Sequence, residues 1–320
     1  MEYIRKLKKL PAMVAIGGTR LPCLKLLDHL FHQEKAEQYK YDLLSRADPA
    51  EYPRLAEKLY RLYTMETLHL DCPRSFNEKI QWIKLYDADP LKTRLADKYL
   101  VREWVEDKIG QEYLIPLLGV WGNFEDIDFD SLPNTFILKC NHGSGFVLPV
   151  EDKEKLDISA AKALFDKWMG INFAFNSLEL QYRDIPRKII AEEYISQDSN
   201  LMDYKIHVFR GTPRIIQVIG DRNLEKHTAK ECFLTPKWTP GELMYHTYDS
   251  YEEIPSRPSN VEKMMEIAAT LGKDFQYVRV DLYNLDGQIL FGEMTFTPAS
   301  GYGKWTGSEK YLVGSWICLD

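Results

Sequence analysis

From Leu24 to about Glu106, apolar residues recur three and four positions apart, which is the spacing of helices with one buried face. Leu55, Leu59 and Leu62 are one example. No strand followed by a glycine-rich turn and a helix interrupts this pattern, so we do not expect a dinucleotide-binding Rossmann unit in this part of the chain. We expect residues 1–75 to form a helical N-terminal region.

Capping residues mark the starts of two of the predicted helices. Ser75 and Glu78 have the spacing of a capping box, which predicts a helix from Phe76 to Tyr86. Asp89 and Pro90 end this region and begin the next helix, since proline fits the first turn of a helix and aspartate caps it.

After Asn134 the apolar spacing becomes that of strands joined by tight turns. Strands are predicted at 136–138, 146–148, 188–195, 204–210, 214–221, 277–283 and 288–296. Helices are expected at about 159–169 and at 261–271, the second ended by Gly272. The segments 211–213 and 284–287 have the residues of hairpin turns. The second part of the chain is therefore expected to be α+β with a largely antiparallel sheet.

The formal net charge is −7, from 41 Lys and Arg against 48 Asp and Glu. No dense stripe of cations offsets it, so we expect no nucleic-acid partner. No apolar run reaches the ~20 residues that a membrane-spanning helix needs. The five cysteines form no CxxC pair and the seven histidines show no zinc-binding spacing, which indicates a reduced, cytoplasmic protein without structural zinc.

The first 25 residues carry six cations and one acidic residue, Glu2. Gly17, Gly18 and two prolines interrupt the apolar positions, so a secretion signal is not expected. A solvated helical arm is the simpler interpretation. The alternative is a peripheral contact with the inner face of the membrane, where cations are attracted to anionic headgroups.

Lys139 leaves a predicted strand just before a loop of small residues, in which Gly143, Ser144 and Gly145 follow His142. The backbone N–H groups of such a loop can approach phosphate oxygens, and the ammonium group neutralises their charge. The spacing is not that of a P-loop, so an ordinary β-turn is the competing interpretation. For His142, as for His207, we expect a structural role.

Two strands near the C-terminus place acidic residues on a shared face. Strand alternation puts Arg279 and Asp281 on one face, and Glu293 and Thr295 on one face of the partner strand. Across a hairpin, Asp281 and Glu293 come close enough to repel each other unless a cation lies between them. Their hard oxygens suit Mg²⁺. The competing interpretation is an amphipathic hairpin with exposed carboxylates.

Asp203 and Lys205 are expected on one face of their strand by the same alternation. Such a pair can be a surface ion pair, which contributes little to stability. The alternative is that these two side chains hold a ribose hydroxyl and a phosphate.

In order, these segments resemble the TupA-like ATP-grasp family, named for teichuronopeptide biosynthesis, from about residue 70 to the end. The resembling segments are 75–82, 95–102, 114–120, 138–145, 190–195, 203–205, 221–222, 278–283 and 291–296. The resemblance implies an ATP-grasp fold at 76–320, in which a lysine and glycine-loop subdomain, 76–190, and a metal-binding subdomain, 191–320, clasp the nucleotide.

The resemblance also implies ATP and Mg²⁺ as cofactors and gives roles to individual positions. The residues expected to bind ATP are Lys98, Lys139, Gly143, Ser144 and Gly145 at the phosphates, Glu192, Glu193, Tyr194 and Ile195 at adenine, and Asp203 at the ribose. Lys205 and Arg222 are expected near the phosphates or an acyl phosphate. Asp281 and Glu293 are the expected Mg²⁺ ligands.

Two features depart from the family's pattern. Thr295 stands where ATP-grasp enzymes usually have asparagine in Glu-x-Asn, so one metal has a ligand fewer or a water in its place. No Rossmann-like domain comes first, so the carboxylate substrate is not placed by analogy. Arg279 and Lys304 flank the hairpin and are our candidates for binding an anionic substrate, with His142 as a further substrate contact.

The activity that the resemblance implies is ATP-dependent ligation of a carboxylate to an amine through an acyl phosphate. The family's name points to an amino acid or amine joined to a uronic acid of capsule, teichuronopeptide or a precursor, with polysaccharide-synthesis enzymes as partners at the membrane. An acidic substrate needs a locally basic cleft. Candidates for lining it are Arg210, Arg214, Arg222, Lys226 and Lys230.

Two other classes of protein compete with the ligase. A glycosyltransferase of the same pathway would use a UDP-sugar, but the Asp-x-Asp segments at 87–89 and 126–128 are in unsuitable positions for its metal motif. A non-catalytic scaffold that retains nucleotide binding is the third class, and the intact lysine and carboxylate set argues against it.

Overall fold

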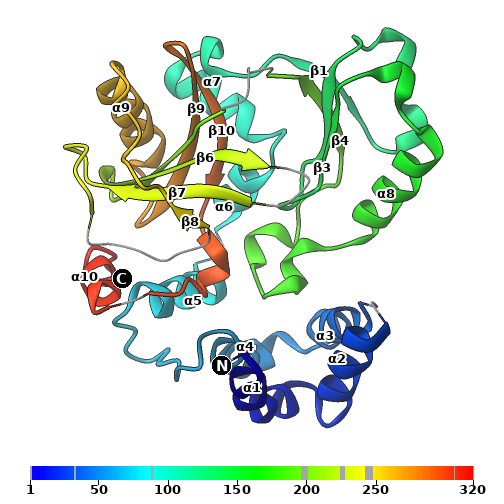
Figure 1. Ribbon diagram of the computed structural model, residues 1–320, viewed down its shortest axis with the longest axis vertical. Helices are drawn as coiled ribbons and strands as arrows, with labels where there is room; N and C mark the ends of the chain where they lie inside the picture. The colour runs from blue at the N-terminus through cyan, green and yellow to red at the C-terminus, as the bar shows by residue number, and fades with distance from the viewer. Residues whose placement is uncertain are drawn as a thin grey trace.

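The computed structural model describes residues 2–31, 34–87, 89–195, 201–223, 228–241, 248–305 and 307–319. In this part of the chain a group of helices precedes two β-sheets, which lie on opposite sides of the molecule with helices beneath and around them (Figure 1). The helical N-terminal region and the α+β body that the sequence predicts are therefore confirmed.

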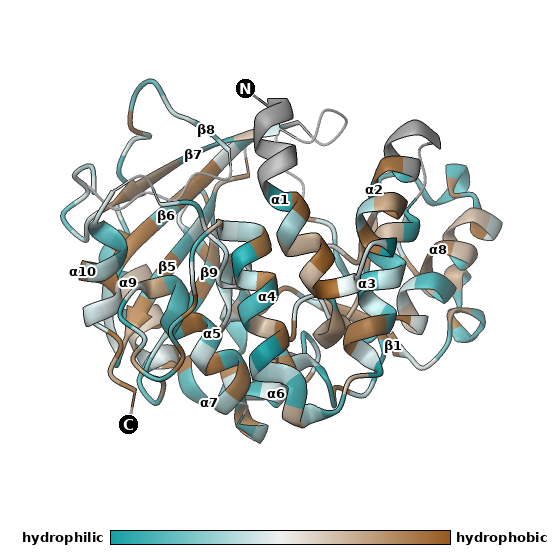
Figure 2. Cartoon of the chain, turned by 90° about the horizontal axis from the view of Figure 1, so that it is seen from below, coloured by the Kyte–Doolittle hydropathy of each residue, from teal (hydrophilic) through white to brown (hydrophobic). Residues whose placement is uncertain are grey.

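The N-terminal region consists of α1 (Glu2–Gly17), α2 (Arg20–Phe31), α3 (Lys35–Ser45) and α4 (Tyr52–Thr64). The helices are amphipathic and carry both apolar and hydrophilic residues (Figure 2). Their buried faces form one core, with Leu44, Leu59 and Tyr60 at its centre. Leu178 and Leu180 from the sheet-bearing body complete this core, so the N-terminal region is packed against the body.

The four-stranded sheet has the order β1-β4-β2-β3 and is antiparallel throughout. Its strands are β1 (Leu117–Trp121), β2 (Phe136–Cys140), β3 (Val147–Val150) and β4 (Ile189–Glu193). Helix α8 (Ile158–Gly170) packs on one face through Phe165, which contacts the core residues Phe136 and Leu138. The loop between β2 and β3 holds the predicted glycine-rich segment.

The six-stranded sheet has the order β10-β9-β5-β6-β7-β8, and only the β7–β8 pair is parallel. Its strands are β5 (Asp203–Phe209), β6 (Thr212–Asn223), β7 (Thr228–Leu234), β8 (Asp249–Ser250), β9 (Val278–Leu285) and β10 (Gln288–Thr295). Helix α9 (Val261–Gly272) covers one face through Met264 and Ile267. The opposite face carries polar residues, as the alternation along β5 and β9 predicts.

Helices α5 (Phe76–Tyr86), α6 (Pro90–Ala96) and α7 (Val101–Ile109) connect the N-terminal region to the sheets. Leu95 and Val105 belong to the core under the six-stranded sheet. α5 packs with α10 (Glu309–Ser315) near the end of the chain. The subdomain boundary at residue 190 stays a prediction, and the structure places strand β4 across it.

Several element boundaries differ from those predicted. Lys139 lies inside β2, where it pairs with Val147, and not in the loop. The first hairpin turns at Arg210 and Gly211, both with positive φ, whereas residues 212–213 belong to β6. The second hairpin turns at Asp286 and Gly287, also with positive φ, so Asn284 and Leu285 belong to β9. Gly272 is the last residue of α9 and not its cap.

Candidate functional site

The polar face of the six-stranded sheet brings together the charged residues of β5, β9 and β10. Lys205 is paired with Asp281 across β5 and β9, and Asp281 is paired with Glu293 across β9 and β10. The hairpin therefore places the two predicted metal ligands side by side. The register shift at Phe291 to Glu293 marks a bulge just before Glu293, and bulges of this kind redirect side chains at functional sites.

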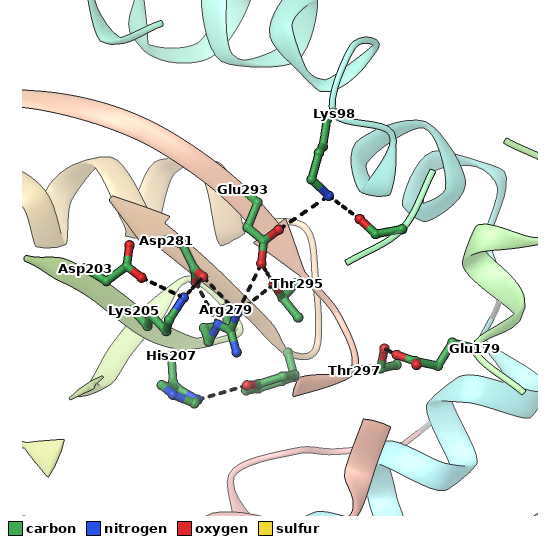
Figure 3. A network of polar contacts seen from close by, with 12 residues as sticks. Lys98, Glu179, Asp203, Lys205, His207, Arg279, Asp281, Glu293, Thr295 and Thr297 are labelled. Carbon is green, nitrogen blue, oxygen red and sulfur yellow. Dashed lines mark hydrogen bonds and ion pairs between the residues drawn. The ribbon is translucent and has the colours of Figure 1, made fainter. Parts of the chain in front are cut away.

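Arg279 contacts both predicted carboxylate ligands and Thr295, which was predicted beside them (Figure 3). Its Nε donates to Asp281 Oδ1 at 2.7 Å and one terminal nitrogen donates to Asp281 Oδ2 at 2.8 Å. The same nitrogen lies 3.2 Å from Glu293 Oε1 and 3.0 Å from Thr295 Oγ1. Asp281 and Glu293 lie close together and need a positive charge between them, and in this structure the guanidinium of Arg279 supplies it.

Three other cations complete this charge cluster. Lys205 contacts Asp281 and lies 3.6 Å from Asp203, and Arg222 contacts the same carboxylate of Asp203. Lys98 Nζ lies 3.6 Å from Glu293 Oε2. All of these residues were predicted from the sequence, and the structure brings them into one network.

Lys98 connects this cluster to the glycine-rich loop. Its Nζ donates to the carbonyl oxygen of Gly143 at 2.5 Å, and its backbone N–H donates to Asn141 O at 3.0 Å. A side chain at Gly143 would meet the rings of Phe173 and Phe146 at less than 3 Å, so glycine is required there by close packing. Ser144 and Gly145 are exposed at the tip of the loop.

Lys139 projects from β2 of the four-stranded sheet and contacts Glu192 of β4. Arg102 of α7 contacts the other carboxylate oxygen of Glu192 at 3.3 Å and donates to Ile115 O at 2.8 Å. Glu192 is thus held by two cations. Arg102 belongs to a segment that resembles the family, but no role was predicted for it, because its partner lies 90 residues away in sequence.

A cavity of about 790 Å³ lies at the end of β4, where the residues expected to bind adenine are found. Glu193, Tyr194 and Ile195 line one side, and Leu114, Pro116 and Leu290 are among its apolar residues. Its size and its mixed apolar and polar lining are typical of a small-molecule site. Arg102 also lines this cavity, so the cavity adjoins the Glu192 contacts.

The ionisation of Glu293 reflects its surroundings. Burial alone would raise the pKa of its carboxyl group, but the positive charges of Lys98, Arg279 and Lys205 and the Thr295 hydrogen bond lower the pKa to about 2. Glu293 is therefore an anion over the whole physiological range and is available as a hard oxygen ligand.

The donor set fits Mg²⁺, which commonly takes one or two carboxylates, substrate phosphates and waters. Asp281 and Glu293 supply the carboxylates and Thr295 a hydroxyl, which donates to Glu293 Oε1 at 2.9 Å. Among the described residues, no three His, Cys, Asp or Glu side chains gather into a metal-binding group. A cation here would rely on ligands beyond these two carboxylates.

Two predicted substrate residues lie apart from the charge cluster. His142 is buried, stacks near Phe146, and places Nε2 at 3.2 Å from the carbonyl oxygen of Trp168. Burial lowers the pKa of its imidazole to about 4, so it is neutral. Lys304 lines a small separate cavity with Glu66 and Lys310.

The predicted basic cleft is only partly assembled. Arg222 belongs to the charge cluster, but Arg210 donates to Gln276 at 2.6 Å, Arg214 lies over the ring of Trp316, and Lys230 is near Asp221. Lys226 lies outside the described residues. Both Asp-x-Asp segments act as local caps: Asp89 caps α6 and Asp128 caps a short 3₁₀ turn.

A buried hydrogen-bond network continues from β10 and was not predicted. Thr297 donates to Glu179 and accepts a hydrogen bond from Gln181 at 2.7 Å, and Ser300 Oγ donates to Glu179 at 2.8 Å. Ala299 and Ser300 both have positive φ, an unusual backbone for residues with a side chain. No local sequence pattern predicts this network, because Glu179 and Gln181 lie more than 110 residues before their partners Thr297 and Ser300.

One family of known proteins is similar to this chain in sequence. The sequence model of one family, described as TupA-like ATPgrasp, matches residues 78–313. None of the curated proteins matches the chain.

In the part of the chain that the structure describes, no helix is both long enough and apolar enough to cross a membrane.

Solved structures similar to the chain include two D-alanine–D-alanine ligases. The ligase from Bacillus anthracis complexed with ATP has a TM-score of 0.39 and 18% identity, over 70% of this chain and 63% of that one. The Helicobacter pylori enzyme has a TM-score of 0.42 and 16% identity, over 71% and 61%. An L-amino acid ligase from Bacillus licheniformis has a TM-score of 0.40 and 15% identity, over 76% and 52%. The chain thus spans between 52% and 63% of each of these three structures.

Proposed function

The chain belongs to the TupA-like ATP-grasp family, and on this basis we propose that it is an ADP-forming carboxylate–amine ligase. The observation that carries the proposal is the charge cluster. Lys98, Lys205 and Arg279 converge on Asp281 and Glu293 of the β9–β10 hairpin. Leu285 and Leu290 of the same hairpin line the cavity of about 790 Å³. Cations and paired carboxylates in one place suit a metal-bound polyphosphate.

We assign the nucleotide to the space between the two sheets. The adenine would occupy the cavity beside Glu193, Tyr194 and Ile195. The residues proposed to hold the rest of ATP are Asp203 at the ribose, and Lys98, Lys139 and the loop of Gly143, Ser144 and Gly145 at the phosphates. Asp281, Glu293 and Thr295 would hold Mg²⁺, which neutralises phosphate charge when it is bound.

The proposed reaction has two steps. A carboxylate oxygen of the substrate attacks the γ-phosphorus of ATP, the bond to the β–γ bridging oxygen breaks, and ADP leaves with that electron pair. The nitrogen of the amine then attacks the acyl carbon, phosphate leaves and the amine loses a proton. Arg279, Lys205 and Arg222 are placed to stabilise the negative charge that develops on the phosphoryl and acyl oxygens.

For the substrate we propose an amino acid or amine joined to a uronic acid of a cell-surface polysaccharide or its precursor. The family's name, with its reference to teichuronopeptide, supports this choice. Capsule synthesis, a cytoplasmic location and a peripheral contact of the basic N-terminus with the membrane or with polysaccharide-synthesis enzymes are parts of the same proposal. Arg5, Lys6 and Lys8 belong to that terminus, and their side chains lie outside the described residues.

Hydroxylamine tests the reaction without knowledge of the natural amine, because it converts an acyl phosphate into a hydroxamate. The protein is incubated with ATP, Mg²⁺ and hydroxylamine together with glucuronate or UDP-glucuronate. The proposal predicts equal amounts of ADP and hydroxamate that depend on the acid. Release of UDP from UDP-glucuronate with no ADP would instead support the glycosyltransferase alternative.

A further inference from the structure

The position of the Arg279 guanidinium has a consequence for metal binding. It contacts Asp281 through two parallel hydrogen bonds, at 2.7 and 2.8 Å, and reaches Glu293 and Thr295 at 3.2 and 3.0 Å. Paired contacts of this kind are the strongest that an arginine makes with a carboxylate. The group therefore touches all three residues that would ligate Mg²⁺ (Figure 3).

The charges of the cluster are already compensated. Its carboxylates are Asp203, Asp281 and Glu293, and its cations are Lys98, Lys205, Arg222 and Arg279. With one more cation than carboxylates, the cluster has no net negative charge to attract a free divalent ion. Most of these side chains are largely buried, so solvent screens them only weakly.

We propose that Arg279 occupies the place of the metal in the nucleotide-free protein, so that a divalent cation binds there only together with a nucleotide. This inference rests on the proposed function, in which Asp281, Glu293 and Thr295 are the metal ligands. The phosphates bring the negative charge that the cluster lacks, and they give the guanidinium new acceptors. Arg279 then moves from the carboxylates to the phosphates as the metal enters.

Lys98 provides a matched control for this proposal. It also contacts Glu293, but through Oε2 at 3.6 Å, whereas Arg279 uses Oε1, the oxygen that Thr295 also contacts. Replacing Lys98 by Met removes one positive charge from the cluster and leaves the space among the ligands filled by Arg279. Comparing Arg279→Met with Lys98→Met therefore separates the effect of emptying the space among the metal ligands from the effect of removing one positive charge.

The test measures Mn²⁺ binding by electron paramagnetic resonance, with wild type, Arg279→Met and Lys98→Met. Without nucleotide, we expect Arg279→Met to bind Mn²⁺ at least about tenfold more tightly than either of the other two proteins. With a non-hydrolysable ATP analogue, wild type is expected to bind Mn²⁺ as tightly as Arg279→Met does. Circular dichroism checks that both variants are folded.

The outcomes separate this inference from the proposed function. Tight binding of Mn²⁺ by wild type without nucleotide would overturn the inference, as would equal gains in Lys98→Met and Arg279→Met. A third result would also overturn it: wild type binds Mn²⁺ in the presence of the analogue, but Arg279→Met without nucleotide binds Mn²⁺ no more tightly than wild type does. Wild type that binds no Mn²⁺ even with the analogue would contradict the proposed function itself.

Discussion

Glu293 is the residue at which the two halves of the site meet. Lys98, which also binds the glycine-rich loop, contacts one of its carboxylate oxygens, and Arg279 and Thr295 contact the other. The side chain is therefore fixed between the two sheets and is ionised. A change at this position alters the chemistry of the site with little effect on the hydrophobic cores, none of which includes Glu293.

Glu293→Gln keeps the size of the side chain and removes its charge. We expect turnover to fall by at least about 100-fold, because a metal ligand and a fixed charge in the site are lost. The protein should stay folded at the assay temperature, with a lower thermal midpoint because the stabilising ionised carboxylate is lost. Steady-state ADP release and a thermal scan measure the two effects, and Glu309→Gln, in the short helix α10, is the matched control. Normal turnover of Glu293→Gln would remove Glu293 from the metal site.

The lowered pKa of Glu293 predicts a pH dependence of stability. Its pKa falls from an ordinary value of 4.5 to about 2 on folding, so its ionised form stabilises the native state. That contribution is complete above pH 4.5 and is lost progressively as the pH falls toward 2. The difference in urea stability between wild type and Glu293→Gln should therefore shrink below about pH 4.5. A difference that grows as the pH falls would contradict the assignment.

The sequence predicted most residues of the charge cluster but not their contacts. Alternation along a strand is local, so Arg279 could be placed on the same face as Asp281, and Lys205, on another strand, on the same face as Asp203. The contact of Lys98 with Glu293 and that of Arg102 with Glu192 join distant segments, and no spacing in the sequence reveals them. The buried network around Glu179 was missed for the same reason.

At the scale of elements, capping and alternation predicted well where the signals were strong. The helix from Phe76 to Tyr86 begins and ends at the predicted residues, and both groups of its capping box are formed. Strands β1, β7 and β8 were not predicted. All five residues of β1 are half-buried and show no alternation, and β8 has only two residues, both exposed. Tertiary pairing, and not a local pattern, defines β1 and β8.

The capping box offers a test at this scale. Ser75→Ala removes the side-chain acceptor at the start of α5 and should lower the free energy of unfolding by about 1 kcal/mol. Ser308 precedes α10 but forms no capping hydrogen bond, so Ser308→Ala should have much less effect. Urea denaturation compares the two variants. Equal losses would show that the cap of α5 contributes no more than a surface serine.

The turn between β9 and β10 is a second test. Gly287 has a φ of +99°, and a Cβ there would contact nothing within 4 Å. Gly287→Ala therefore adds only backbone strain and should cost about 1–2 kcal/mol in unfolding free energy. Gly122 is equally open without a positive φ, which makes Gly122→Ala the control. If both alanines cost the same, strain in the turn is not the cause.

At the scale of the whole molecule, the two sheets line one cavity, to which Leu117 and Glu193 belong from one sheet and Leu285 and Leu290 from the other. Two contacts between residues that the structure describes join the sheets. Lys98 contacts both Gly143, in the loop between β2 and β3, and Glu293 of β10, and an isolated β-bridge joins Leu114 to Phe291 of β10. The fold was predicted from the resemblance and not from periodicity alone, because the order of strands in a sheet depends on pairings between distant segments. For the helical N-terminal region we predicted a contact with the membrane surface or with a partner, and this role stays a prediction.

The central claim is that the space between the sheets binds ATP with a divalent metal. Thermal unfolding with Mg²⁺ plus a non-hydrolysable ATP analogue, beside Mg²⁺ plus UDP, tests it most directly. At a hundred times its dissociation constant the analogue should stabilise the protein by about 2.7 kcal/mol, and UDP should not. Lys139→Ala should reduce the shift, since Lys139 is assigned to the phosphates. A shift with UDP and none with the ATP analogue would contradict the account.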